Sequence, residues 1–233
     1  MKYKILRLTI AMQFGDIKDI VYPTLLWDEQ NIILVDCGFT DSLPILEKEL
    51  QRHRLSVHQI TGLVLTHHDH DHMGAAAALK RMNHNIKIYS SPVEAPFISA
   101  QKKPLRLCQA EEMQKTLPPE QQALGEAFCK ILRRVEPVQV DSLLHDGERL
   151  DWCGGCRVIA TEGHTPGHIS LLMENDSIII TGDAIALEGS VPVIANPQFT
   201  LDIEKATKSM EKLLSIKASA YYCYHGGVYS PAD

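Results

Sequence analysis

A nine-residue stretch of the sequence gathers side chains that bind metal ions. Residues 66–74 read THHDHDHMG, so four histidines and two aspartates occupy six consecutive positions. Histidine nitrogen and carboxylate oxygen are ligands that zinc and similar ions take from proteins. An apolar run from Ile60 to Thr66 precedes the cluster and an alanine-rich run follows it, which predicts a strand, a loop and a helix. We therefore expect a metal site between strand and helix, where α/β proteins place their chemistry.

The alternation of side chains along a strand divides the six residues into two sets. If the strand continues for one or two residues past Thr66, His67 and Asp69 point to one side and His68 and His70 to the other. Asp71 and His72 then lie at the start of the helix, where free backbone N–H groups can orient a carboxylate. The residues predicted to converge are His67, Asp69, Asp71 and His72. We expect His68 and His70 to flank them, and to be alternative ligands if the strand ends earlier.

Three later segments each place a metal-competent side chain just past an apolar, strand-like run. TEGHTPGHIS carries His164 and His168, IIITGDAIA carries Asp183, and YCYHGG carries His225. So many polar groups converging in a protein interior would be costly without a metal ion to satisfy them. The sequence therefore predicts that these segments complete the site begun by residues 66–74.

In this order and at these separations, THHDHDHMG, GHTPGH, TGD and YHGG resemble the motifs of the metallo-β-lactamase fold superfamily. The resemblance covers about residues 20 to 227. It implies a four-layer αββα sandwich, a fold of the mixed α/β (α+β) class. It also implies two metal ions in a cleft at one edge of the paired sheets.

The resemblance assigns a role to each matching position. It makes His67 and His164 ligands of the first metal, makes Asp71, His72 and His225 ligands of the second, and lets Asp183 bridge the two. Asp69 stands where the superfamily usually has histidine, and it remains a reasonable ligand because carboxylate oxygen also binds zinc. Since His164 already matches the family position, His168 is expected to support a ligand or to face the substrate.

The aspartate at position 69 changes the expected charge of the site. Two divalent ions bring four positive charges, and Asp69, Asp71 and Asp183 cancel three of them. The usual histidine would leave one more positive charge. We therefore expect a weaker Lewis acid with harder ligands, for which zinc is the leading metal and manganese or iron are alternatives.

A dinuclear site of this kind predicts hydrolysis. Two ions roughly 3.5 to 4 Å apart can share a hydroxide, because each lowers the pKa of bound water. We expect this hydroxide to attack a small ester, lactone or thioester, with Asp71 as a catalytic residue that accepts a proton from the bridging water and orients it. A phosphodiesterase or a β-lactamase-like hydrolase is an alternative reading.

Two further readings come from other classes of protein. Superfamily branches with a carboxylate at the position of Asp69 include di-iron proteins, so an iron-dependent oxidoreductase is one alternative. A metal-binding regulatory or assembly module without turnover is another. The leading reading rests on elimination: no signal peptide indicates a secreted β-lactamase, and the chain ends about eight residues after His225, without the longer helical segment expected of a glutathione thioesterase.

Composition limits the partners and the location. The 233 residues are 45% hydrophobic and 22% charged, which predicts one globular domain over residues 1–233. A net charge of −6 without a basic run disfavours nucleic acid and membrane surfaces, so we expect a small-molecule substrate. No run approaches the roughly 18 to 20 apolar residues of a membrane span. Six scattered cysteines suit a reducing compartment, and we expect a cytoplasmic protein.

Residues 94–134 differ in character from the rest of the chain. They are polar, rich in Gln, Glu and Lys, and broken by prolines, which predicts two or three helices inserted between strands. Such an insertion can form a lid or a pocket wall, or be a solvated decoration. We consider it, together with Phe39 or Tyr22, as a possible wall of the substrate pocket. Amphipathic helices are also predicted from Ser42 onward and over residues 203–214.

Overall fold

Two six-stranded sheets pack face to face in the computed structural model, which describes residues 3–14 and 17–231. The first sheet runs, in spatial order, through β1 (Lys4–Arg7), β4 (Thr24–Trp27), β5 (Ile32–Val35), β6 (Gly62–Val64), β7 (Lys87–Ser90) and β8 (Ser142–Leu143). The second runs through β16 (Gly227–Tyr229), β15 (Ala220–Cys223), β12 (Ile178–Gly182), β11 (Ile169–Met173), β10 (Cys156–Ala160) and β9 (Arg149–Leu150).

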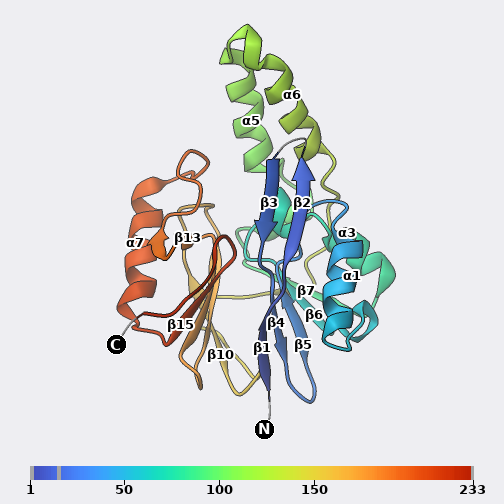
Figure 1. Ribbon diagram of the computed structural model, residues 1–233, viewed down its shortest axis with the longest axis vertical. Helices are drawn as coiled ribbons and strands as arrows, with labels where there is room; N and C mark the ends of the chain where they lie inside the picture. Colours follow the sequence, from blue (N-terminus) through green and yellow to red (C-terminus); the bar gives the residue numbers. More distant parts are fainter. Residues whose placement is uncertain (1–2, 15–16, 232–233) are drawn as a thin grey trace.

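Helices cover the outer face of each sheet (Figure 1). On the first sheet lie α1 (Leu43–Arg52) and α3 (Ala76–Met82). The short helices η1 (Val57–Gln59) and α2 (His70–Met73) come between these two along the chain. On the second sheet lies α7 (Ile203–Ser215). The predicted αββα sandwich is confirmed. A sheet that is covered on both faces needs apolar side chains on both faces, and the runs TLLW of β4 and IILV of β5 supply them.

Three groups of buried side chains correspond to the three interfaces between layers. Leu26, Val64 and Leu171 belong to the group between the sheets. A second group holds α1 and α3 against the first sheet, and a third holds α7 against the second. Leu46 and Leu50 of α1 are buried, as the helical spacing predicts. The predicted apolar stripe of α7 is wrong at Ile203, the first residue of the helix, which is 49% exposed.

The strand before the metal-binding stretch is shorter than the sequence predicts. We expected residues 60–66, but β6 ends at Val64. The reason lies in a side chain: the backbone N–H of Thr66 donates to Asp36 Oδ1 at 2.9 Å, in place of a partner on a neighbouring strand. The chain thereby leaves the sheet two residues earlier than expected.

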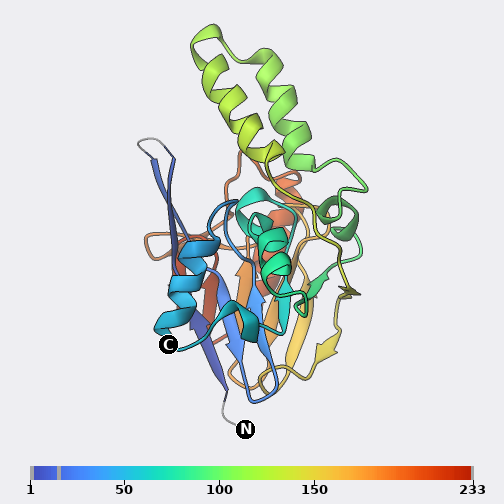
Figure 2. The same ribbon diagram turned by 90° about the vertical axis from the view of Figure 1, so that its right-hand side faces the viewer.

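Two projections extend from the same end of the sandwich (Figures 1 and 2). One is the hairpin of β2 (Ile10–Phe14) and β3 (Ile17–Val21), and the other is a helical hairpin of α5 (Leu105–Thr116) and α6 (Pro119–Arg133), which follows the short α4 (Ala95–Ile98). A small hairpin of β13 (Ala186–Glu188) and β14 (Val191–Val193) completes the strands. In the part of the chain that the structure describes, no helix is long and apolar enough to cross a membrane.

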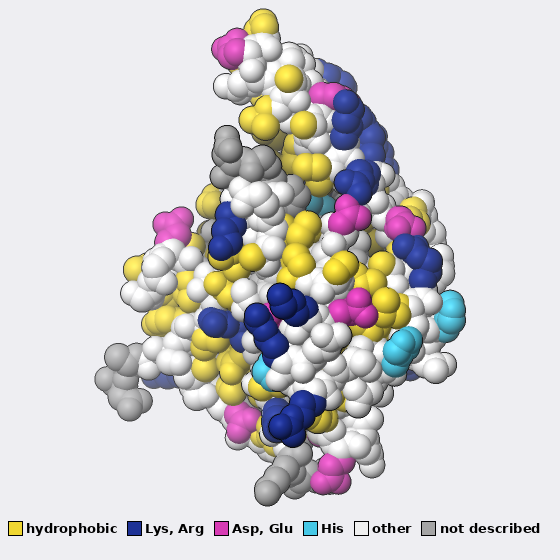
Figure 3. All heavy atoms as spheres, turned by 45° about the vertical axis from the view of Figure 1, so that its right-hand side comes forward, with side chains coloured by type: hydrophobic (Ala, Val, Ile, Leu, Met, Phe, Trp, Pro, Cys, Tyr) yellow, Lys and Arg dark blue, Asp and Glu magenta, His cyan; other side chains and the backbone are white. Residues whose placement is uncertain are grey.

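The helical hairpin has two unlike sides. Lys and Arg side chains run along one side of it, and hydrophobic side chains gather on the other (Figure 3). Met113 and Leu124 are exposed, at 43% and 71%. Nearer its base, Ala110, Cys129 and Leu132 are buried and pack the two helices against each other. The base also contacts the sandwich, since Leu105 N donates to His68 Nε2 at 3.2 Å, whereas the tip is solvated.

Candidate metal centre

Seven side chains from four segments meet at the end of the sandwich from which the hairpins project. Strands β6, β12 and β15 all end at this edge, and the loop between β10 and β11 reaches it too. The seven are His67, Asp69, Asp71, His72, His164, Asp183 and His225, which we call the metal cluster. Five of them are less than 5% exposed, and Asp71 is 8% exposed. The structure thus brings together every residue predicted as a ligand.

The first triad consists of His67, Asp69 and His164, whose ligand atoms all lie within 4.8 Å of one another. Asp69 Oδ2 lies 3.1 Å from His164 Nε2 and 3.6 Å from His67 Nε2. These separations match those between neighbouring ligands around one tetrahedral ion whose metal–ligand bonds are roughly 2 Å.

The second triad consists of Asp71, His72 and His225, and meets the same distance limit. Asp71 Oδ2 lies 3.3 Å from His225 Nε2 and 3.7 Å from His72 Nε2. A helix start suits this arrangement, because α2 begins at His70 and places Asp71 and His72 in its first turn.

Asp183 lies between the two triads. Its Oδ2 is 3.3 Å from His164 Nε2, and its Oδ1 is 3.2 Å from His72 Nε2 and 3.4 Å from His225 Nε2. One carboxylate oxygen therefore faces each triad. Burial alone would raise the pKa of Asp183, but the three imidazoles around it hold the pKa well below its usual range, so the group is a carboxylate.

The chemistry of the cluster fits metal ions. Among the described residues, eight buried side-chain N and O atoms lack a hydrogen-bond partner, and five of them belong to the cluster: His67 Nε2, Asp69 Oδ1, His72 Nε2, Asp183 Oδ1 and His225 Nε2. Buried polar atoms are normally satisfied, since leaving one without a partner costs roughly 1 to 3 kcal/mol. A concentration of such atoms on imidazoles and carboxylates fits a site that can hold a metal ion.

Asp36 orients two imidazoles, one from each triad. Its Oδ2 accepts from His72 Nδ1 at 2.8 Å and from Thr66 Oγ1 at 2.8 Å, and Thr66 Oγ1 in turn lies 3.0 Å from His67 Nδ1. With Nδ1 engaged, Nε2 of each ring is left for a metal ion. Sequence reasoning missed Asp36, although LVDCG places it directly past an apolar strand, as with the other segments. Its φ of 58° is one that aspartate tolerates better than most residues.

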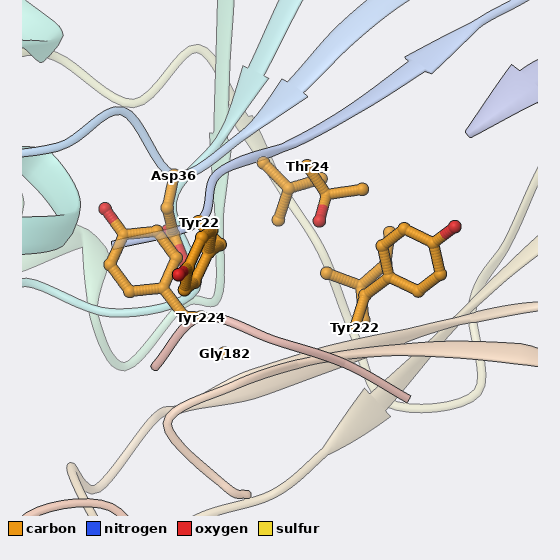
Figure 4. Close-up of a pocket in the computed structure, with 8 residues that line it drawn as sticks. Tyr22, Thr24, Asp36, Gly182, Tyr222 and Tyr224 are labelled. Atoms are coloured by element: carbon orange, nitrogen blue, oxygen red, sulfur yellow. The ribbon is translucent and has the colours of Figure 1, made fainter. Parts of the chain in front are cut away.

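Tyr224 supports the second triad from the core side. Its hydroxyl donates to the backbone carbonyl of Asp71 at 2.5 Å and accepts from Gly38 N at 3.1 Å, and its ring centroid lies 3.9 Å from that of His72. Figure 4 shows Tyr224 and Asp36 in a narrow pocket between the sheets, together with Tyr22 and Gly182. Tyr22 therefore lines a pocket on the sandwich side of the cluster.

His168 holds the backbone that carries Asp183. Its Nε2 accepts from Asp183 N at 2.9 Å, so its Nδ1 carries the proton and donates to Thr161 Oγ1 at 2.8 Å. Both ring nitrogens are used, which leaves none for a metal ion or a substrate. Gly182, with φ 53°, makes this approach possible, because a Cβ there would lie 2.6 Å from His168 Nε2.

The two flanking histidines lie outside all three groups of candidate ligands. His68 pairs with the buried Glu94 and accepts from Leu105 N at 3.2 Å. His70 packs its ring against Phe39 and Phe128, with centroids 6.0 and 5.7 Å away. The structure therefore places both as alternation along the chain predicts, although β6 ends early.

Glu94 joins the metal-binding stretch to the loop that carries His164. Its Oε2 accepts from the backbone N–H of His68 at 3.0 Å, and its Oε1 accepts from Thr165 Oγ1 and Gly167 N, both at 2.8 Å. Burial would raise the pKa of Glu94, but His68 lowers it below its usual value, so Glu94 is a carboxylate. No local signal in the sequence marks Glu94, because its partners lie 26 to 73 residues away.

Arg106 of α5 reaches into the metal cluster. It donates to Asp69 Oδ2 from Nε at 3.0 Å and from Nη2 at 2.5 Å. Burial would raise the pKa of Asp69, but the guanidinium and the imidazoles of His164 and His67 hold it well below its usual range. His164 is steadied separately, since its Nδ1 lies 3.3 Å from Thr200 Oγ1. Sequence reasoning missed Arg106 and Thr200.

Comparison with known proteins agrees with this geometry. The family model of the metallo-beta-lactamase superfamily matches residues 17–225. The chain therefore belongs to this superfamily, and by class it is a metallo-hydrolase. Solved structures under 25% identical show the same fold: a metallo-beta-lactamase family protein from Thermus thermophilus has a TM-score of 0.77 at 23% identity, over 97% of this chain and 74% of that one.

Two curated relatives are similar in sequence. A probable metallo-hydrolase, YflN of Bacillus subtilis, is 25% identical over 232 residues, which cover 93% of this chain and 82% of the relative. The hydroxyacylglutathione hydrolase GloC of Haemophilus influenzae is 27% identical over 165 residues, or 70% of this chain and 65% of the relative.

Proposed function

We propose that this protein hydrolyses a small ester, lactone or thioester with the help of two divalent metal ions, with zinc as the leading metal. One observation carries the proposal: two ligand triads adjoin each other, share Asp183, and leave five buried donor or acceptor atoms without partners. His67, Asp69 and His164 would hold one ion, Asp71, His72 and His225 would hold the other, and Asp183 would contact both. When bound, the ions would activate water as a nucleophile and polarise the scissile carbonyl.

Within this site Asp71 is placed to orient the attacking water. Its Oδ2 faces His225 and its Oδ1 lies 3.3 Å from His70 Nδ1, so one carboxylate oxygen remains on the side away from the second triad. The Tyr224 hydroxyl fixes the backbone of Asp71, which limits how far the carboxylate can turn. We infer that Asp71 accepts the proton of the attacking water and orients it.

The surroundings favour a small substrate with an apolar part. A pocket beside the cluster is lined by His68, His70, Pro104, Arg106, Leu107, Leu132 and Val135, between the metal-binding stretch and the helical hairpin. Close by, the Phe128 ring lies 5.7 Å from that of His70 and 5.7 Å from that of Phe199. We infer that this wall contacts the apolar part of the substrate. A thioester belongs in the test set because one relative is a hydroxyacylglutathione hydrolase.

A substrate screen on protein of defined metal content tests the proposal. Metal-free protein would be reloaded with zinc, manganese or iron, and offered lactones, thioesters, simple esters, a phosphodiester and a cephalosporin. We expect turnover of an ester, lactone or thioester that a chelator abolishes and zinc restores. Turnover confined to the phosphodiester or the cephalosporin would contradict the substrate class, and oxygen consumption with redox-active iron would contradict hydrolysis.

A further inference from the structure

Arg106 is the only lysine or arginine, among those the structure describes, whose side chain is buried. It is 4% exposed and is the second residue of α5, at the base of the helical hairpin. Besides its two bonds to Asp69, it donates from Nη1 to Gln109 Oε1 and to the carbonyl of Phe199. Its guanidinium carbon lies 5.1 Å from the centre of the Phe199 ring. A buried charge this well paired is held in one orientation.

The partner of Arg106 is the one residue of the metal cluster that departs from the superfamily pattern. Asp69 adds a negative charge where a neutral histidine is usual, and the guanidinium supplies a positive charge within hydrogen-bond distance of it. Counted with two divalent ions, the site keeps two positive charges, the same number that the histidine pattern leaves. Nη2 of Arg106 also lies 3.3 Å from His164 Nε2, so this charge faces the first triad.

We propose that Asp69 and Arg106 form one unit that takes the place of the usual histidine. Asp69 supplies the ligand oxygen, and Arg106 positions its carboxylate and cancels its charge. Arg106 is thus a positioning residue, and through it the inserted hairpin becomes part of the first metal site. The inference rests on the proposed dinuclear site, and it makes a separate claim, that the two side chains depend on each other.

The opposite reading gives the guanidinium a blocking role. In that case Arg106 occupies the place of the first ion, and the protein binds one metal ion. The two readings differ in what removal of the guanidinium does while position 69 is still aspartate: a blocked site gains an ion, whereas a site that depends on the pair gains none. If the pair is one unit, the guanidinium left unpaired by Asp69→His repels the two cations, and its removal restores binding.

A cycle of metal-binding measurements tests this. The wild type, Asp69→His, Arg106→Gln and the double variant would each be titrated with zinc against a chromophoric chelator. We expect Asp69→His alone to lose roughly ten-fold or more in affinity at one of its two sites, and Arg106→Gln in the same chain to recover most of that loss. As a matched control, Arg133→Gln on the exposed side of α6 should give no recovery.

The same dependence must appear without metal, which separates this claim from the proposed function. Asp69→Asn keeps the shape of its side chain without the charge, Arg106→Gln removes the guanidinium, and urea unfolding of the metal-free variants gives their stability. We expect each single variant to unfold at lower urea, and the double variant to lose less than the sum of the two. Additive losses, or equal zinc affinity of Asp69→His with and without Arg106, would overturn the proposal. A second zinc ion gained by Arg106→Gln alone would establish the blocking role instead.

Discussion

The two sides of the metal cluster are held by different parts of the molecule. On the core side, His67 and His72 depend on Asp36, and Asp71 depends on Tyr224, so the sheets themselves fix these ligands. On the outer side, Asp69 depends on Arg106 of the helical hairpin, and His164 depends on Thr200 in the loop before α7. The core side is held by the two sheets, whereas the outer side is completed by the helical hairpin and by the loop before α7. We therefore expect the two sides to respond differently to mutation.

The largest effect should come from Asp183, because it serves both sides. Replacing Asp183 with Ala removes the carboxylate that faces both triads, so metal binding and hydrolysis should fall together, activity by roughly a thousand-fold or more. Metal content and turnover of the same preparation would check this. Glu204→Ala, an exposed change on α7, is the matched control. A variant that kept its activity with one ion bound would contradict the dinuclear site.

Glu94 tests the connection between the two sides. Glu94→Gln removes a buried charge that holds His68, Thr165 and Gly167 together, so the unfolding free energy should fall by about 3 kcal/mol. Urea unfolding of metal-free protein measures this, and Glu112→Gln, an exposed change on α5, should leave stability almost unchanged. Equal stability of both variants would show that the loops hold their positions without Glu94.

Asp36 tests the core side alone. Asp36→Asn keeps the size of the side chain but loses the charge-assisted bond from His72 Nδ1, and metal affinity should drop about 100-fold. Because Asp36 reaches His67 through Thr66, both ions should be affected. Zinc titration would measure the affinity of each site. A loss of affinity for only one of the two ions would show that Asp36 supports the second triad alone.

Thr200 tests the outer side with the smallest change. Thr200→Val removes the hydroxyl beside His164 Nδ1 and should weaken one ion by about ten-fold, with the other ion unchanged. Thr207→Val, on the exposed face of α7, is the control for the loss of a threonine hydroxyl. Equal weakening of both ions would remove the distinction between the two sides.

The same division explains what the sequence could predict. Every proposed ligand lies at the end of an apolar run, so strand patterns and motif spacing were enough to find His67, His164, Asp183 and His225. Asp36 carries the same signal and could have been found. Arg106 and Glu94 could not, because helical periodicity does not tell which residue of an insertion turns inward. Asp69 lies 37 residues from Arg106, and the partners of Glu94 lie up to 73 residues away, so only the folded chain brings these side chains together.

The fold was predictable for a related reason. Short apolar strands bounded by Gly, Asp and Asn, and helices with one apolar stripe, allow few arrangements other than layered sheets covered by helices. The end of β6 was not predictable from the sequence. The Asp36 side chain, 30 residues away, accepts a hydrogen bond from the backbone N–H of Thr66, which would otherwise have extended the strand. Polar contacts over long sequence separations thus account for most of what the sequence left open.

The number of metal ions per chain decides whether the two triads form a dinuclear site. Protein stripped with a chelator, reloaded with zinc and freed of excess would be analysed by mass spectrometry of the metal and by titration. We predict two ions per chain in the wild type, with the hydrolysis of an ester, lactone or thioester rising as the second ion binds. One ion per chain at full activity, or no bound metal, would contradict the dinuclear site.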